Sequence, residues 1–271
     1  MRAFASDLDR TLIYSKRILE QYPKQDYRLI ETLNGKEISY ISDYTNKLLQ
    51  KMTGEMYFIP VTTRTIEQYR RITLFQTAIK PEYAITSNGG HILKNGEVVK
   101  EWSDRIRASL ETCLPLDDFV TQLGNHVTGN WIERIRHADH LFVYLIIKRD
   151  EVSTEELTYL FEWAKVQGWQ PSLQGRKLYF VPNPVNKWRA VEFLKEELSL
   201  SFIYTAGDSL LDYELVYNGD QGYVPSHGEV LDSYPGLRRT KSAGMKASEE
   251  ILDLILEDLR LKRHQPLEQN S

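Results

Sequence analysis

The stretch Ala-Ser-Asp-Leu-Asp-Arg-Thr, residues 5–11, carries the strongest information about the fold. It continues a short apolar opening and places two aspartates, Asp7 and Asp9, one residue apart. This pattern is typical of the C-terminal end of a buried strand, where open α/β sheets bind their ligands. A carboxylate there can attack phosphorus, and a neighbouring carboxylate can transfer the proton. The alternative is a strand that ends in an acidic turn, since Asp and Thr favour turns.

Composition limits the classes of protein that remain. The chain has 271 residues, is 41% hydrophobic and carries a net charge of −4, which fits one large or two moderate globular domains. No basic stretch dominates, so nucleic acid is not expected as a partner. The single cysteine, Cys113, fits a reducing compartment. No apolar run has membrane-spanning length, and Asp7 and Asp9 lie where a signal peptide needs its apolar core. We therefore expect a cytoplasmic protein without a membrane partner.

Strands and helices alternate at both ends of the chain, but not in the middle. The alternating parts predict a Rossmann-like parallel sheet, with strands near residues 4–8, 57–61, 83–86 and 202–205. The middle predicts an antiparallel sheet with helices on one face: a hairpin at 91–93 and 97–102, a helix at 104–123, strands at 131–137 and 141–148, a helix at 154–167, and strands at 169–173 and 177–181. The prediction is an α/β core domain, residues 1–88 and 184–271, with an inserted α+β cap domain, residues 89–183.

Four further segments bear on the overall layout. Residues 28–33 and 37–41 flank Asn34-Gly35 and predict a β-hairpin. This hairpin can reach either the mouth of the active site or a partner subunit, which would make an oligomer, and the sequence leaves both open. Short edge strands are expected at 223–224 and 237–240. The polar tail from His264 to Ser271 is predicted to be disordered.

Three more polar signals lie at the ends of predicted core elements. Thr62 ends the second strand, where a hydroxyl either caps a helix or holds a phosphoryl oxygen. Lys187 begins a helix, although the helix dipole disfavours a cation there, which hints at an anion nearby. Asp208 and Asp212 follow the strand at 202–205, and two carboxylates four residues apart repel unless a cation such as Mg²⁺ joins them. Taken singly, each has an ordinary structural explanation as a cap or a surface charge.

Taken in order, the four signals resemble the haloacid dehalogenase (HAD) superfamily of aspartate-nucleophile phosphatases. Residues 7–11, DLDRT, look like its first motif, Thr62 its second, Lys187 its third and residues 207–212, GDSLLD, its fourth. The cap follows Ser87-Asn88-Gly89-Gly90, which is similar to the C2-capped branch with its Cof-type phosphatases, sucrose-phosphate phosphatases and phosphomannomutases. The chain departs from many relatives at Thr63, where they have glycine.

The resemblance implies a role for each motif residue. Asp7 is expected as the nucleophile and Asp9 as the general acid and base, with Thr62 and Lys187 on the transferring oxygens. Mg²⁺ is expected at a site built from Asp7, Asp9, Asp208, Ser209 and Asp212. For Asp9 to start protonated, its pKa has to rise. Substrate contacts are expected from the loops around the site and from the cap: Thr63, Arg64, Asn88, Gly89, His91, Arg134, Arg136, Arg176, Lys177 and Asn186.

The function implied is a Mg²⁺-dependent hydrolase of a small phosphorylated metabolite, with a sugar as one candidate, acting through an aspartyl-phosphate. Two alternatives stay open. A sugar phosphomutase shares the intermediate and would need a bisphosphate for turnover. A non-catalytic HAD-scaffold binding or regulatory protein would bind a ligand or a protein without hydrolysing phosphate esters.

Overall fold

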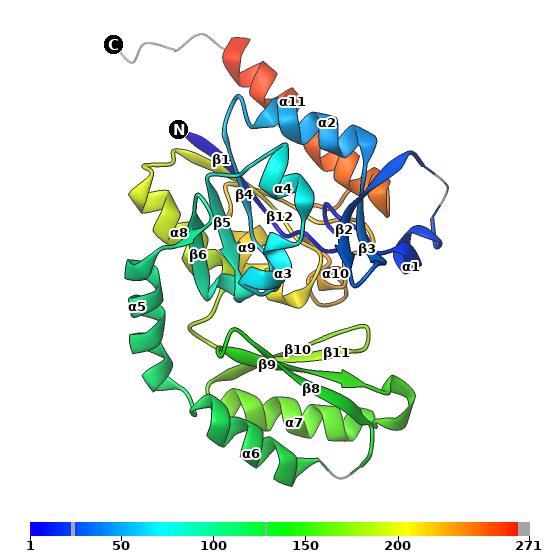
Figure 1. The fold of residues 1–271 in the computed structure, drawn as a ribbon, viewed down its shortest axis with the longest axis vertical. Helices are drawn as coiled ribbons and strands as arrows, with labels where there is room; N and C mark the ends of the chain where they lie inside the picture. The colour runs from blue at the N-terminus through cyan, green and yellow to red at the C-terminus, as the bar shows by residue number, and fades with distance from the viewer. Residues whose placement is uncertain (23–24, 128, 265–271) are drawn as a thin grey trace.

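The computed structural model describes residues 1–22, 25–127 and 129–264, so most of the tail predicted to be disordered lies outside the described residues. Its centre is a parallel sheet in the order β13-β12-β1-β4 (Figure 1), made of β1 (Arg2–Ser6), β4 (Tyr57–Pro60), β12 (Phe202–Ala206) and β13 (Gln221–Tyr223). A parallel bridge between Val61 and Ile85 adds β5 (Tyr83–Thr86), and β6 (His91–Lys94) and β7 (Glu97–Val98) continue antiparallel. The predicted parallel-sheet core is confirmed.

Helices cover both faces of this sheet because successive side chains of a strand point to opposite sides. Phe4 of β1 belongs to the same apolar cluster as Ile251 and Leu252 of α11 (Met245–His264), which lies beside α2 (Asp43–Met52). Ala3 and Ala5 instead belong to the apolar cluster that holds α8 (Lys187–Glu197) and α9 (Tyr213–Asn218). The strands therefore read as nearly continuous apolar runs, as parallel strands buried on both faces do.

The inserted segment forms a second, antiparallel sheet in the order β10-β11-β9-β8, from β8 (Ile132–Ala138), β9 (Phe142–Ile147), β10 (Trp169–Gln174) and β11 (Lys177–Pro182). Figure 1 shows α6 (Leu116–His126) and α7 (Thr154–Val166) on the side of this sheet turned away from the core. Leu145 and Phe180 are fully buried and belong with Phe119 and Leu160 of these helices to one apolar cluster. The predicted α+β cap is confirmed.

The single helix predicted over residues 104–123 is wrong. The chain forms α5 (Lys100–Ser109), a short 3₁₀ turn η2 (Leu110–Thr112) and α6, with Pro115 immediately before α6. Proline has no backbone N–H and disfavours helical geometry in the residue before it, so the helix cannot run through this point. The strand predicted to reach residue 102 ends at Val98, because the chain turns into α5 at Lys100. Of the edge strand expected at 237–240, only a bridge from Arg239 to Val224 forms.

The predicted hairpin is present as β2 (Tyr27–Leu33) and β3 (Lys36–Ser42). Asn34 and Gly35 both have positive φ, as a tight two-residue turn requires. One side of the hairpin is buried against the core through Ile30 and Ile41, while Tyr27, Leu29 and Leu33 are exposed. An oligomer contact through these exposed residues stays a prediction.

The remaining elements are short: α1 (Lys16–Leu19), α3 (Ile66–Arg70), α4 (Thr73–Thr77), η1 (Ser87–Gly89), η3 (Arg149–Glu151), η4 (Leu210–Asp212) and α10 (Val230–Ser233). Within the described ranges, no helix combines the length and the apolar character that crossing a bilayer demands.

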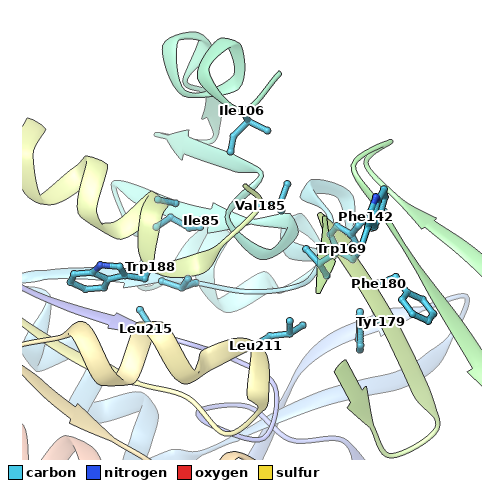
Figure 2. Close-up of a cluster of buried hydrophobic side chains, with 14 of the residues drawn as sticks. Ile85, Ile106, Phe142, Trp169, Tyr179, Phe180, Val185, Trp188, Leu211 and Leu215 are labelled. Atoms are coloured by element: carbon cyan, nitrogen blue, oxygen red, sulfur yellow. The ribbon is translucent and has the colours of Figure 1, made fainter. Parts of the chain in front are cut away.

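Because β6 pairs with β5, residues 91–98 extend the core sheet, and we propose that the cap as a packing unit begins after them. The division at 88/89 and 183/184 stays a prediction. An apolar cluster runs without a break across the joint: in Figure 2, Ile85, Val185 and Leu211 lie on the core side and Phe142, Trp169 and Phe180 on the cap side.

Two loops meet closely at this joint. Ser87, Asn88 and Gly89 all have positive φ, and a Cβ on Gly89 would lie 2.1 Å from the backbone oxygen of Asn186. On the other side of the joint, Asp139 in the β8–β9 turn accepts hydrogen bonds from the Ser87 hydroxyl and from the Ile66 N–H, the latter at 3.0 Å. The position at which α8 begins therefore depends on the close approach of residues 87–90.

Gly89→Ala tests this close approach against backbone strain. Gly89 and Gly96 both have positive φ, but nothing lies within 4 Å of a Cβ on Gly96. We expect Gly96→Ala to lose about 1 kcal/mol of unfolding free energy from backbone strain. Gly89→Ala should lose about 1–3 kcal/mol more because it adds overpacking. Urea unfolding of both variants measures the difference, and equal losses would contradict the close approach.

Candidate active site

Three segments far apart in the sequence meet at one edge of the core sheet. Asp7 follows β1 and Asp208 follows β12, and because Ser6 pairs with Ala206 the two strands end side by side. Lys187, the first residue of α8, is 1% exposed and places its Nζ 2.6 Å from Asp7 Oδ1 and 2.5 Å from Asp212 Oδ1. A buried ammonium needs such partners, because leaving it unpaired costs several kcal/mol.

Asp212 holds both the lysine and the loop before it. Its Oδ2 accepts the N–H groups of Asp208 at 3.2 Å and Ser209 at 2.9 Å, and the Ser209 hydroxyl at 2.7 Å. A Cβ on Gly207 would lie 2.3 Å from Asp212 Cβ, so the tight turn needs glycine there. The Ser209 hydroxyl thus binds Asp212, and its part in holding a metal stays a prediction.

The acidic groups leave a net negative charge that suits a cation. Oxygens of Asp7, Asp208 and Asp212 lie within 4.8 Å of one another, and all three residues are buried. Burial raises the pKa of Asp7 to about 7, although Lys187 opposes the shift. Burial, and then the charges of Asp7 and Asp212, raise the pKa of Asp208 well above its usual range. Hard oxygen donors with uncompensated charge fit Mg²⁺.

Asp9 lies in a different electrostatic environment. Arg64 binds both of its carboxylate oxygens, Nε to Oδ2 at 2.7 Å and Nη2 to Oδ1 at 2.8 Å. Partial burial alone would raise the pKa of Asp9, but Arg64, with smaller contributions from Lys177 and Lys187, more than offsets it, and the pKa lies below its usual value. This is opposite to the rise expected for a general acid. Arg64 was expected to contact substrate, but most of its side-chain N–H groups are already bonded to protein groups.

Three threonines lie beside these charged groups. Thr11 donates its hydroxyl to Asp7 Oδ2 at 3.0 Å, which fixes the second oxygen of that carboxylate. Thr62 is fully buried, and its hydroxyl accepts the Arg64 N–H at 3.1 Å. The hydroxyl hydrogen of Thr62 remains for another acceptor. The Thr63 side chain interacts with the Tyr179 hydroxyl of the cap.

The loop residues expected to bind substrate mainly brace the joint. Asn88 donates its side-chain N–H to the Val185 carbonyl at 3.1 Å. Its Oδ1 is buried without a partner among the described residues. Asn186 caps α8 by accepting the N–H groups of Trp188 and Arg189. Gly89 packs against Asn186. Their contacts with a substrate stay predictions.

One face of the cap sheet is turned toward the site. Directly paired residues share a face, and the pairs Tyr144 with Tyr179, Arg136 with Tyr144 and Arg134 with Ile146 place both arginines on the face of Tyr179. Tyr179 and then Asp9 help to raise the pKa of Lys177, which pairs with Ile146 on this same face. Lys177 and Tyr179 are therefore the cap residues that the structure brings toward Asp9.

The other cap candidates are less well placed. Arg176 lies in the turn between β10 and β11 and donates to both oxygens of Glu133 at 2.6 Å. His91 has a buried Nδ1 without a partner among the described residues, and burial lowers the pKa of its imidazole. Neither Arg134 nor Arg136 forms an ion pair with any described residue.

Sequence reasoning missed several residues that the structure places around the site. Arg10 binds Asp208, Nε to Oδ2 at 3.3 Å, and Glu229, Nη1 to Oε1 at 2.6 Å. Glu31 of the hairpin reaches Arg64, and Tyr179 reaches Thr63. No local pattern singled out Glu31, because the same strand also carries Arg28 and Thr32.

Comparisons with known proteins agree with this architecture. A model of the family described as sucrose-6F-phosphate phosphohydrolase matches residues 1–261. No curated protein sequence matches the chain. Among solved structures, sucrose-phosphatase from Synechocystis in complex with sucrose and phosphate is 17% identical, with 95% of this chain and 98% of that chain covered and a TM-score of 0.68.

Two further structures share the fold. A HAD subclass IIB sugar phosphatase is 12% identical, with 95% of this chain and 99% of that chain covered and a TM-score of 0.59. A haloacid dehalogenase-like hydrolase from Bacillus subtilis is 16% identical, with 95% and 89% covered and a TM-score of 0.52. Identities this low support the fold, while the family match carries the assignment.

His227 gives the site a measurable pH dependence of stability. Its Nδ1 accepts the Gly244 N–H at 3.1 Å, so the ring is neutral, and its Nε2 donates to the Arg10 carbonyl at 2.8 Å. Burial lowers the pKa of His227 from 6.5, although the bond to Arg10 opposes the shift. The stability that depends on the neutral ring is therefore present above pH 6.5 and lost as the pH falls through the folded-state pKa.

We expect the melting temperature of His227→Gln to fall less than that of the wild type between pH 7.5 and 5.5 (about one pH unit on either side of an ordinary histidine pKa). Differential scanning fluorimetry measures both slopes. His140→Gln, at an exposed histidine in the β8–β9 turn, is the control and should keep the wild-type slope. Equal slopes for His227→Gln and wild type would contradict a buried neutral His227.

Proposed function

Because this chain belongs to the sucrose-6F-phosphate phosphohydrolase family, and so is a HAD-type phosphatase of sugar phosphates, we propose that it hydrolyses the phosphate monoester of a small sugar with Mg²⁺ through an aspartyl-phosphate on Asp7. The observation that carries the proposal is the meeting of Asp7, Lys187, Asp208 and Asp212 at one sheet edge. We also keep the cytosol as the proposed location.

Asp7 is the proposed nucleophile because both of its oxygens are fixed. Lys187 holds Oδ1 and Thr11 holds Oδ2, so the carboxylate has one orientation toward an incoming phosphorus atom. Asp7 Oδ attacks phosphorus, and the bond from phosphorus to the sugar oxygen breaks. Mg²⁺, which Asp7, the Asp9 carbonyl and Asp208 would hold, offsets the repulsion between carboxylate and phosphate when it is bound. Asp212 would support the site through the loop and Lys187.

Asp9 is the proposed proton carrier. An incoming phosphoryl group brings negative charge beside Asp9, which opposes Arg64 and raises the carboxyl pKa toward the protonated form. Asp9 then gives its proton to the departing sugar oxygen. The ionised carboxylate, which Arg64 favours, next takes a proton from the water that attacks the aspartyl-phosphate. The same environment thus suits the second step better than the first.

The transferring phosphoryl oxygens need donors, and two are available. Lys187 uses two of its three N–H bonds on Asp7 and Asp212, which leaves one for a phosphoryl oxygen. No group in the described part of the chain accepts the Thr62 hydroxyl hydrogen, so it is available to a phosphoryl oxygen as well. Such preorganised donors stabilise the charge that develops on the transferring group.

We propose that the face of the cap sheet turned toward the site binds the leaving group. Tyr144 and Tyr179 give flat apolar surfaces with hydroxyl tips, and Lys177, Arg134 and Arg136 give cationic donors. This combination suits a polyhydroxylated sugar that carries further acceptors. A phosphomutase needs the same groups, but the family match is to a phosphohydrolase.

Asp7→Asn should abolish turnover because an amide cannot form the phosphoryl-enzyme. Lys187→Ala should lower kcat about 10²–10³-fold, as removal of one preorganised donor does. A panel of sugar phosphates assayed with Mg²⁺ and with EDTA measures both effects. A bisphosphate requirement for turnover would instead favour the phosphomutase, and no hydrolysis by the wild type on any ester would favour the binding protein.

Lys177→Ala tests substrate recognition by the cap. We expect the KM of the best sugar phosphate to rise about 10-fold, as loss of one charge-assisted hydrogen bond predicts, with a smaller change in kcat. Lys165→Ala is the matched control, since Lys165 is exposed on α7 and pairs with Glu162. A KM equal to that of Lys165→Ala would remove Lys177 from the recognition surface.

A further inference from the structure

Glu31 is a carboxylate that the mechanism above does not use. It lies in β2 of the hairpin, and its side chain is 0% exposed. Its Oε2 accepts from Arg64 Nη1 at 2.6 Å and from the Ser39 hydroxyl at 2.7 Å, and its Oε1 accepts from Arg71 Nε at 3.1 Å. A buried carboxylate is tolerated only when such partners satisfy it. Both oxygens are therefore committed.

Arg64 connects this buried carboxylate to Asp9. It gives Nε and Nη2 to Asp9 and Nη1 to Glu31, and its Nη2 also donates to the Ser39 hydroxyl at 2.9 Å. The guanidinium group is planar and rigid, so holding it at one end fixes it at the other. The Arg64 backbone is fixed as well, because its N–H binds Thr62 and its carbonyl accepts the Ser87 N–H at 2.7 Å.

The two carboxylates on Arg64 differ in freedom. The Asp9 side chain is 48% exposed, whereas the Glu31 side chain is enclosed. A half-exposed carboxylate can rotate about its own bonds unless something fixes it. Glu31 is therefore the fixed partner of Arg64, and Asp9 is the partner whose rotation Arg64 restricts.

We propose that Glu31 is a positioning residue: through Arg64 it fixes the orientation in which Asp9 meets the leaving oxygen, and so makes the β2–β3 hairpin part of the catalytic apparatus. This inference rests on the proposed function, in which Asp9 transfers the proton. The Glu31 side chain touches neither the reacting carboxylate of Asp7 nor Lys187.

A purely structural role is the competing explanation. Glu31 also binds Arg71 at the end of α3, and this contact anchors the hairpin on the core. A residue that only anchors the hairpin would affect folding, or would slow all substrates equally. A residue that orients a proton donor has a selective effect, because a poor leaving group needs the proton and a good one does not.

The experiment measures kcat/KM with Mg²⁺ for phenyl phosphate, 4-chlorophenyl phosphate and 4-nitrophenyl phosphate. This constant reports the steps up to loss of the phenol, and the phenols differ in how much they need protonation. For Glu31→Gln we expect kcat/KM for phenyl phosphate to fall about 10–100-fold, in the range seen when the support of a functional group is removed. The kcat/KM for 4-nitrophenyl phosphate should fall much less, so that kcat/KM depends more steeply on the leaving group.

Three further variants make the result decisive. Asp9→Asn gives the reference slope for a missing proton donor. Arg64→Lys keeps the charge without the planar fork, and it should steepen the slope even if Glu31→Gln does not fold. Glu67→Gln removes the exposed partner of Arg71, at 3.6 Å, and should stay within about 2-fold of wild type on every substrate. Thermal unfolding of each variant reports stability separately.

The outcomes separate this inference from the proposed function. Suppose that the wild type hydrolyses these esters and that Asp9→Asn steepens the slope. If Glu31→Gln and Arg64→Lys then lower kcat/KM equally for all three substrates, the positioning role is overturned and the proposed function stands. If the wild type with Mg²⁺ hydrolyses neither these aryl phosphates nor any sugar phosphate, the proposed function itself fails.

Discussion

The ammonium of Lys187, buried between the carboxylates of Asp7 and Asp212, is the interaction on which the rest of the structure depends. None of these three groups is stable in its position alone, since each would be a buried charge without a partner. The contact joins the end of β1, the start of α8 and the loop after β12. It therefore connects the beginning of the chain to the segment that returns from the cap.

This constraint explains the close fit of the neighbouring loops. Lys187 lies at the carboxylates because α8 begins where Gly89 meets the backbone of Asn186, and that contact needs the positive φ and the missing Cβ of Gly89. Asn186 stabilises the same helix start by capping it. Across the joint, Asp139 binds Ser87 and the N-terminal end of α3. The cap is thus held against the core by contacts beside the site.

Charge is distributed unequally over the site. Around Asp7, Asp208 and Asp212 the negative charge exceeds the positive charge of Lys187 and Arg10. Burial is the larger cause of the raised pKa values of Asp7 and Asp208, and the neighbouring carboxylates add to it. Around Asp9 the opposite holds, because Arg64 lowers its pKa. One half of the site therefore favours a cation, and the other half is neutralised by the protein itself through Arg64 and the hairpin.

The sequence by itself determined the parallel core, the cap and the four motif segments, because apolar runs, Asn-Gly turns and strand-end aspartates are local signals. The break before α6 was also encoded locally, by Pro115, although a single helix was predicted over residues 104–123. Only the tertiary structure decided that Arg64 binds Asp9 and that Glu31 lies behind it. These contacts join residues 55 and 33 positions apart, and which charges meet depends on how the hairpin folds onto the core, which no local pattern encodes.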